Sequence, residues 1–555
     1  GSFSTSNVLT YDKRIKKTHH VMVQLGQEYV SRWTRALESG VSNMTTDDFG
    51  MDNTAVGTPS IVNSSFNDSD KLLSFFTRVN YDYKAKYLFT ASLRADGSSK
   101  FGKDHKWGYF PAVSAAWRMA EEDFIRNLNI FSDLKLRAGY GLAGNNRIGS
   151  YNSLALMNSV LTASGSSLVN GVAVTQIPNP DLKWESNKTF NLGLDIGFLN
   201  QRITITPEFY INESNDLLLN APLPESSGYT SMIVNAGSTR NVGFDLTVTS
   251  HNLNVAEFDW TTTLTLSHNK NTVKSLVGGD RQMYEAKFGY SQNTHLLEVG
   301  SPVGQFFGLI TEGLYQVEDF DYNPATKTYL LKEGIPYQGS RESVKPGMWK
   351  FKDIDHSGTI TEDDKTVIGN ATPKLFGGLN NSFVWKGFDL SVFLTFSVGA
   401  DVLNATKLIT TKVGSQNYNA LAIADQHNRW MTINSKGDIV YDPAELAALN
   451  SGKTVAAYYD MEQGDNYIHS WAVEDASYLK LANITFGYTF PERWLSKLGV
   501  KKCRLYFTGN NLVTLTSYTG FDPEVSTMSS PLTPGVDFGA YPLSRTFIFG
   551  TNIVF

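Results

Sequence analysis

The sequence predicts an all-β protein, built as a large antiparallel barrel whose strands are long enough to cross a membrane. Three observations lead to this fold class: long segments that alternate apolar and polar residues, a regular alternation of short and long connections, and a high aromatic content. The 555 residues include 26 Tyr and 33 Phe, and aromatic side chains favour strands. Charged residues make up only 18%, below the ~25% of a typical soluble domain.

Two neighbouring segments illustrate the alternation. Every second residue of 190–198 is apolar, and after the short LNQR stretch a second apolar series begins at Ile203. Asn191, Asp195 and Glu208 occupy the intervening positions. Because successive side chains of a strand point to opposite faces, these segments predict two strands with one apolar and one polar face.

The lengths of the strands and of the connections point to a membrane. About fifteen such segments occur, most of them ~9–14 residues long, and almost no helical periodicity is sustained. Strands tilted across a bilayer need about 9–11 residues, whereas ordinary strands average about 5–6. Short connections fall near residues 83–86, 120–132, 199–202, 252–256, 385–387 and 491–501, and long ones near 33–68, 97–106, 144–184, 215–239, 271–375, 400–475 and 517–542.

This alternation predicts short turns at one end of a barrel and elaborate loops at the other. Strands cross hydrocarbon only as closed barrels, because lipid offers no hydrogen-bond partners. The apolar face then contacts lipid, and Asn191, Asp195 and Glu208 face the interior. The alternative is a large soluble β protein, such as a polysaccharide-binding sandwich or a β-helix, and strand length and loop alternation favour the barrel over it.

Composition excludes several other classes. The net charge of -6 gives no basic surface, so nucleic-acid binding is not expected. Cys503 is the only cysteine, so no intrachain disulfide forms. No run of 18 apolar residues predicts a membrane helix, and the opening GSFSTSNVLT has no signal-peptide pattern. HExxH, GxSxG and CxxC motifs are also missing, so we expect no enzyme.

Seven stretches resemble the SusC/RagA group of TonB-dependent outer-membrane transporters of Bacteroidetes. They cover nearly the whole chain in order, and their combination is far more specific than any one of them. The stretches are YLFTASLRADGSSKFGKDHKWGYFPAVSAAWRM (Tyr87–Met119), LKLRAGYGLAGN (Leu134–Asn145), LKWESNKTFNLGLDIGFLNQRI (Leu182–Ile203), NVGFDL (Asn241–Leu246), VEDASYLKLANITFGYTFP (Val473–Pro491), GNNLVTLTSYTGFDPE (Gly509–Glu524) and YPLSRTFIFGTNIVF (Tyr541–Phe555).

The resemblance implies a barrel of about 22 strands with a plugged lumen, short periplasmic turns and long extracellular loops, in the outer membrane of a Gram-negative cell. It implies a SusD-like surface lipoprotein that captures the ligand, coupling to TonB, and import of an oligosaccharide or a peptide. About fifteen strands lie in 1–555, so we expect this chain to be the C-terminal part of the barrel. The plug, the N-terminal strands and the TonB-contacting segment are expected to lie outside it.

The region 271–375 is expected to be a long extracellular loop that contains an EF-hand-like segment, DIDHSGTITEDD, at 353–364. Calcium takes six to eight oxygen ligands, and the segment places oxygen-bearing residues and a glycine at the calcium-loop spacing. Ser357 in place of an acid and the short Asp364 in place of Glu depart from that pattern, and an acidic turn closed by hydrogen bonds alone is the alternative. The expected ligands are Asp353, Asp355, Ser357, Thr359 through its carbonyl, and Asp364.

Other candidate residues give weaker indications. His19 and His20 are adjacent on a strand and point to opposite faces, so they cannot share one metal ion. Aromatic residues of the long loops suit sugar rings, although packing within the loops is the simpler expectation for each of them. Those residues are Trp430, Tyr458, Tyr459, Tyr467 and Trp471, and the sequence identifies no substrate-binding residue among them.

Phe555 ends a strand of alternating aromatic character. The resemblance implies that this residue is the signal read by the machinery that inserts barrels into the outer membrane; a phenylalanine in the periplasmic aromatic girdle is the alternative. The leading functional hypothesis is an energy-coupled importer. A passive barrel or a surface adhesin that binds ligand through its long loops is the second.

Overall fold

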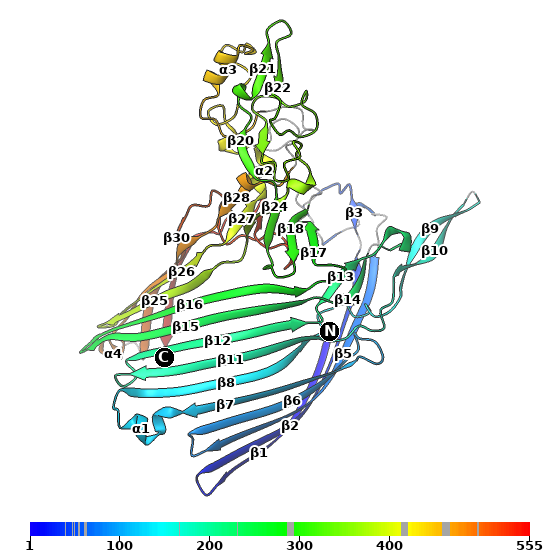
Figure 1. Ribbon diagram of the computed structural model, residues 1–555. Coiled ribbons are helices and arrows are strands. Elements are labelled where there is room, and N and C mark those ends of the chain that lie inside the picture. The colour runs from blue at the N-terminus through cyan, green and yellow to red at the C-terminus, as the bar shows by residue number, and fades with distance from the viewer. Residues whose placement is uncertain are drawn as a thin grey trace. The chain divides into compact units, whose positions relative to one another are not determined.

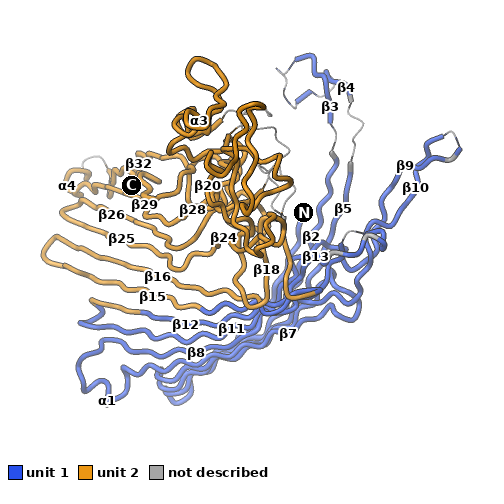
Figure 2. The backbone as a smooth tube through the Cα atoms, turned by 45° about the horizontal axis from the view of Figure 1, so that its top comes forward, with its two compact units in different colours: residues 1–201, 206–242, 274–278 blue, residues 202–205, 243–273, 279–555 orange. Residues whose placement is uncertain are grey.

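A computed structural model describes residues 1–555 except 39, 47, 49, 51, 54–55, 60–63, 166, 230, 286–292, 412–419, 458–466 and 497–498. The chain divides into two compact units (Figure 2). Unit 1 comprises residues 1–201, 206–242 and 274–278, and unit 2 comprises residues 202–205, 243–273 and 279–555.

Fifteen long strands form one sheet in which hydrogen-bonded neighbours follow the order of the chain (Figure 1). Neighbouring strands of this sheet pair antiparallel from β1 to β11 and from β16 to β32, so the chain runs up and down as the connections predicted. The strands are β1 (Ser2–Ile15), β2 (His19–Glu38), β5 (Ser64–Tyr83), β6 (Tyr87–Ser98), β7 (Trp107–Arg118), β8 (Phe131–Asn145), β11 (Glu185–Phe198), β12 (Ile203–Asn215), β15 (Ser238–Val255), β16 (Phe258–Ser275), β25 (Leu375–Trp385), β26 (Phe388–Val398), β29 (Tyr478–Thr489), β30 (Lys502–Thr516) and β32 (Thr546–Val554).

The register gives the sheet of unit 1 an apolar and a polar face. Val79, Ala91, Val113, Tyr140 and Phe190 stand opposite one another on five successive strands, from β5 to β11. Their large side chains are mostly exposed, as expected of a face that contacts lipid. The neighbouring positions carry the charged residues described below. The predicted fifteen strands and their alternation are thus confirmed.

The long connections hold structure that sequence periodicity did not predict. Their small strands pair into separate sheets of two to four strands. In unit 1 these strands are β3 (Val41–Ser42), β4 (Thr58–Pro59), β9 (Leu156–Ser164), β10 (Ser167–Gln176), β13 (Leu218–Pro222) and β14 (Ser231–Asn235). In unit 2 they are β17 (Arg281–Glu285), β18 (Asn293–Glu298), β19 (Gln305–Gly308), β20 (Thr311–Leu314), β21 (Phe320–Asn323), β22 (Thr328–Leu331), β23 (Trp349–Phe351), β24 (Thr366–Asn370), β27 (Asp401–Asn404), β28 (Val473–Asp475) and β31 (Val536–Asp537).

Helices are few and short. Those in the described residues are α1 (Asp123–Arg126), α2 (Ala405–Thr410), α3 (Pro443–Leu449) and α4 (Glu492–Leu495). In the described part of the chain, no helix combines the length and the apolarity that crossing a membrane requires.

Most of the buried apolar side chains lie in the connections of unit 2 and not in the long strands. We call residues 293–374 and 400–477, apart from the residues not described, the loop assembly. One of its cores contains Phe306, Leu403 and Ile468, and another contains Trp430 and Leu446. The long loops therefore fold into a packed structure of their own, whereas the long sheet leaves many large apolar side chains exposed.

Candidate functional site

The polar face of unit 1 carries a connected set of charged side chains. Arg137 on β8 donates from Nε to Asp195 Oδ2 at 3.0 Å and from Nη2 to Asp195 Oδ1 at 3.1 Å. The same Nη2 lies 3.5 Å from Glu208 Oε2, and Asn191 Nδ2 donates to Glu208 Oε1 at 2.6 Å. The three residues that the sequence placed on one face thus form one cluster with Arg137, which contacts Asp195 and Glu208, while Asn191 contacts Glu208.

A hollow of about 300 Å³ adjoins this cluster on the polar face. Small residues, including Ser114, Gly139 and Gly193, line it, and Arg137 and Glu208 border it. A large side chain at Gly193 would collide with Arg137, because a Cβ there would lie 2.7 Å from Nη2. The polar face of unit 1 is therefore hollowed at this point, and its charged side chains are paired with one another.

Similar pairings occur elsewhere on the long strands. In unit 1, Arg94 donates from Nε to Asp96 Oδ1 at 2.7 Å and from Nη2 to Glu28 Oε2 at 3.0 Å. In unit 2, Arg504 Nε donates to Asp389 Oδ1 at 2.9 Å. Arginine with a carboxylate forms a strong, charge-assisted pair, so each cation has a fixed counter-ion. Such a face can border water or a hydrophilic partner, which a lipid-facing surface cannot do.

In the loop assembly, the acidic segment 353–364 brings three carboxylates together. Asp353, Asp355 and Asp364 each offer an oxygen, and these oxygens all lie within 4.8 Å of one another. Asp364 is fully buried. Gly358 has φ of +82°, a value that residues with a Cβ rarely adopt, which agrees with the sharp turn expected at this position. Three of the five predicted ligands therefore converge.

Backbone N–H groups already use several of these carboxylate oxygens. Asp353 Oδ2 accepts from Gly358 N at 2.9 Å, and the two oxygens of Asp364 accept from Ile354 N at 2.7 Å and Thr361 N at 2.8 Å. The hydrogen bond from Ser357 N lowers the pKa of Asp355. Each carboxylate oxygen can accept twice, so the oxygen set still fits a calcium ion.

The two remaining predicted ligands contact each other. The Ser357 hydroxyl donates to the Thr359 carbonyl at 2.9 Å. The next residue, Ile360, is buried in a core with Leu309 and Phe351, and its N–H donates to the Tyr337 carbonyl at 2.8 Å. Ile360 therefore anchors the end of the turn through an apolar core and a backbone hydrogen bond.

The described aromatic residues of the loops mainly pack on other loop residues. Trp430 is buried in a core of the loop assembly. The Trp471 ring lies 5.0 Å from that of Trp349, and Tyr467 packs beside Phe351. Trp430, Tyr467 and Trp471 therefore pack against other loop residues, which was the simpler expectation for each of them. Tyr458 and Tyr459 lie outside the described residues.

The family model for the TonB dependent receptor-like β-barrel matches residues 2–347, more than half of the chain. The chain belongs to the TonB-dependent receptor family. TonB-dependent receptor P3 of Formosa agariphila is 34% identical over 99% of this chain and 52% of its own length. TonB-dependent receptor SusC of Bacteroides thetaiotaomicron is 29% identical over 87% of this chain and 44% of its own length.

Solved structures agree on the fold. The RagAB peptide transporter structure matches with a TM-score of 0.78 at 24% identity, covering all of this chain and 55% of that one. The resemblance to the SusC/RagA group is thereby confirmed, and with it the outer-membrane β-barrel class and location. The chain spans about half the length of the curated relatives it matches.

The two adjacent histidines of this receptor chain lie on opposite faces, as expected. His19 Nδ1 is 2.8 Å from the Tyr81 hydroxyl, on the apolar face. His20 sits on the polar face, with its two ring nitrogens each 2.9 Å from a carboxylate, one of Asp12 and one of Asp82. The prediction that they do not share a metal ion therefore agrees with the geometry.

Sequence reasoning missed the buried charges of unit 2. Lys407 on α2 pairs with Glu474 on β28 at 3.1 Å, and Lys480 on β29 pairs with Glu524 and with Asp522, at 3.7 Å. Lys407 and Glu474 are 67 residues apart in the chain, so no local spacing of residues predicts that they pair. A lysine between the apolar residues of YLKLANITF was the one available hint for Lys480.

Deleting Phe555 is expected to lower the amount of receptor assembled in the outer membrane severalfold. The residue follows β32 and is largely exposed, so its loss removes little packing. Heat-modifiable migration of the receptor in outer-membrane fractions measures assembly. Phe521→Ala, at another exposed phenylalanine, is the control. Unchanged assembly after the deletion would assign Phe555 to the girdle alone.

Proposed function

We propose that this chain forms part of the barrel of a TonB-dependent importer that carries a bulky nutrient, an oligosaccharide or a peptide, across the outer membrane. The observation that carries the proposal is family membership combined with a polar face of paired charges behind an apolar outer face. The carboxylates near Arg137 are engaged by fixed partners, so they support a passage or a plug contact and not acid–base catalysis. The chain acts as a transporter component and not as an enzyme.

The partners follow from the same proposal. Among the described residues, β1 and β32 each have a single neighbour in the fifteen-stranded sheet. Unpaired backbone groups in hydrocarbon cost several kcal/mol each, so we propose that further strands and a plug, encoded with this chain in the full-length receptor, complete the barrel. A SusD-like lipoprotein captures the ligand above the loops, and TonB supplies the energy through the part outside this chain.

Uptake should stop when the proton gradient is collapsed. Cells that express the full-length receptor are given labelled oligosaccharides or peptides, with and without a protonophore, and accumulation is compared with surface binding. Energy-coupled import loses accumulation and retains binding. A passive barrel lets ligand enter equally in both conditions, and an adhesin binds ligand without uptake in either; each result would replace the importer.

We propose further that Ca²⁺ binds in segment 353–364 and braces the loop assembly. Support comes from the convergence of three carboxylates around a turn whose end is buried at Ile360. The ion would take oxygens of Asp353, Asp355 and Asp364, together with the Ser357 hydroxyl or the Thr359 carbonyl. Extracellular calcium modules bind with Kd of about 10⁻⁴–10⁻³ M.

Calcium at about 100 times its Kd is then expected to stabilise the loop assembly by ~2.7 kcal/mol. Titration calorimetry and hydrogen exchange of residues 350–370 measure the binding and its effect. Asp353→Asn keeps an acceptor for Gly358 N and removes the charge, so it should abolish the heat without unfolding the turn. Asp321→Asn, at an exposed acid elsewhere in the loop assembly, is the control. Equal heats for all three proteins, or no heat for the native one, would leave the acidic turn without a metal.

A further inference from the structure

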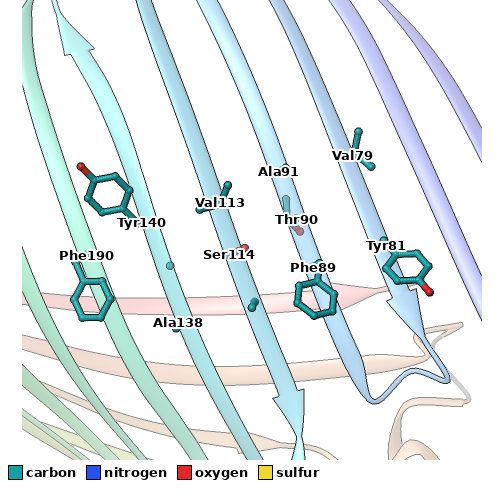
Figure 3. Close-up of a pocket in the computed structure, with 12 residues that line it drawn as sticks. Val79, Tyr81, Phe89, Thr90, Ala91, Val113, Ser114, Ala138, Tyr140 and Phe190 are labelled. Carbon is teal, nitrogen blue, oxygen red and sulfur yellow. The ribbon is translucent and has the colours of Figure 1, made fainter.

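The apolar face of unit 1 contains a groove of about 430 Å³ (Figure 3). Its floor includes Ala91, Ala115 and Ala138, on three successive strands. Its walls carry the larger side chains Val79, Tyr81, Phe89, Val113, Tyr140 and Phe190. Register explains the shape, because Phe89 stands opposite Ala115 and Tyr140 stands opposite Val113 and Phe190. An extended hydrocarbon chain has the shape and polarity that this groove accepts.

An aromatic belt lies between the groove and the short turns. Tyr83 stacks on Tyr87 with ring centroids 6.4 Å apart, and Tyr87 stacks on Trp117 at 6.3 Å. Tyr83 is two residues beyond Tyr81 of the groove, on the same face of β5. Tyrosine and tryptophan concentrate at the level of the lipid headgroups. The belt therefore places the headgroup region directly beside the turns.

Three exposed lysines occupy these turns. Lys16 and Lys17 connect β1 and β2, and Lys84 follows β5. The two turns touch, since Lys84 N donates to the Thr18 carbonyl at 2.6 Å. Within the described residues no carboxylate lies within ion-pair distance of any of the three, whereas Lys86 is only 3.3 Å from Glu122.

The left-handed backbone at these turns does not select for lysine. Lys16, Lys17 and Lys84 have φ of 51°, 56° and 53°, and Ala85 and Leu199 adopt the same left-handed conformation in short turns of this chain. Local geometry therefore does not require lysine there. What the three share is positive charge at the headgroup level, without a protein counter-ion.

We propose that an anionic glycerophospholipid of the periplasmic leaflet binds here, with one acyl chain in the groove and its phosphate against Lys16, Lys17 and Lys84. The short turns are the periplasmic end of a barrel of this family, and that leaflet supplies both the chain and the charge. Basic clusters beside membrane-embedded surfaces bind anionic headgroups through this combination of contacts. The inference depends on the orientation of the barrel and is independent of which nutrient is imported.

The test compares phosphatidylglycerol with phosphatidylcholine. The full-length receptor is purified in a neutral detergent and titrated with each lipid, and native mass spectrometry counts the lipid that it retains. We expect one tightly held phosphatidylglycerol, bound on the order of 100-fold more strongly than phosphatidylcholine. With about a fivefold contribution from each lysine, Lys16→Gln/Lys17→Gln/Lys84→Gln should weaken phosphatidylglycerol on the order of 100-fold, to the level of phosphatidylcholine.

Matched variants separate charge from groove. Arginine at the same three positions keeps the charge and should retain the lipid, and Lys436→Gln, in an exposed loop, should change nothing. Ala91→Leu/Ala115→Leu fills the groove and should weaken both lipids, whereas Thr551→Leu, at an exposed position on β32, should not. Heat-modifiable migration verifies assembly of each variant, and if the glutamine variant does not assemble, the arginine and leucine variants still decide.

Three results would overturn the proposal. Equal retention of the two lipids would mean ordinary annular contact. Unchanged retention of phosphatidylglycerol by the leucine variant would mean that no acyl chain binds in the groove. Displacement of the lipid by glycerol phosphate at a comparable concentration would mean that the lysines bind a free phosphate and that the groove contributes nothing.

Discussion

Replacing Lys407 with Ala is expected to destabilise the loop assembly by about 3–5 kcal/mol, because it leaves a carboxylate buried without its partner. Lys407 Nζ lies 3.1 Å from Glu474 Oε1 and donates to the Trp471 carbonyl at 3.0 Å. The two charged side chains are only 9% and 11% exposed. The ammonium group also lies 4.0 Å from the centroid of the Trp471 ring, which adds a cation–π contact.

The environment of Glu474 makes the stability that it contributes depend on pH. Burial by itself would raise the pKa of Glu474, but two hydrogen bonds from Thr519 and the charge of Lys407 outweigh it and lower the pKa. The stability that Glu474 contributes is therefore present above its unfolded pKa and is lost as pH falls through the folded value. Without Lys407, only the hydrogen bonds from Thr519 still oppose the effect of burial on Glu474, and the variant should be least stable relative to native protein at neutral pH, where this carboxyl is ionised.

Thermal unfolding and hydrogen exchange of residues 401–411 and 473–477 measure this effect. Lys436→Ala, at an exposed lysine, is the control and should leave both unchanged. Lys407→Met/Glu474→Leu removes both charges and should recover most of the lost stability, because apolar residues of similar volume often replace buried ion pairs at little cost. A single Lys407→Ala variant as stable as the native protein would show that water reaches Glu474 in the folded state.

The long strands were predictable because one periodicity controls them. In residues 190–198 and in the neighbouring strands, alternate side chains face lipid or the interior. The sequence of each strand therefore shows both faces through its alternation of apolar and polar residues. The same rule placed Asn191, Asp195 and Glu208 on one face, where Arg137 contacts the two carboxylates and Asn191 contacts Glu208. It could not reveal Arg137 as the partner of the two carboxylates, because pairing across strands depends on register and not on spacing.

The loop assembly was not predictable for a different reason. Its strands are mostly two to six residues long, too short to show a period, and its cores join residues far apart in the chain, such as Phe306, Leu403 and Ile468. Segment 353–364 is the exception, because a turn that gathers its own side chains is encoded locally. Its three carboxylates were found from sequence, whereas the anchoring of Ile360 to Tyr337 required the fold.

Lowering the pH from 6.5 to about 4 is expected to cost the loop assembly roughly 3 kcal/mol through His295 alone. This residue of β18 is fully buried, and its burial lowers its pKa from 6.5 to about 4, although a hydrogen bond to the Pro534 carbonyl opposes the shift. Between these values the unfolded chain binds a proton that the folded chain does not bind. Stability is therefore complete above pH 6.5 and falls as the pH drops toward 4.

The hydrogen bonds of His295 decide which substitution removes its titration and keeps its contact with Pro534. His295 Nε2 lies 2.9 Å from the Pro534 carbonyl and donates to it, and Nδ1 lies 2.8 Å from the Thr294 hydroxyl, which donates in return. His295→Gln keeps a donor for Pro534 and cannot titrate, so its unfolding free energy should be lower at pH 7.5 but should lose the pH dependence attributed to this site. His427→Gln, at an exposed histidine, should retain it.

Hydrogen exchange of residues 293–298 and 533–537, followed from pH 7.5 to 4.5 after correction for the intrinsic exchange rate, distinguishes the outcomes. Native protein and His427→Gln should lose protection together below about pH 6.5, because protonation charges a buried ring and Thr294 can then no longer donate to Nδ1. His295→Gln should lose protection only where carboxylates begin to titrate. Parallel curves for all three proteins would mean that His295 opens to solvent before it is protonated, and that carboxylates elsewhere set the acid limit of the loop assembly.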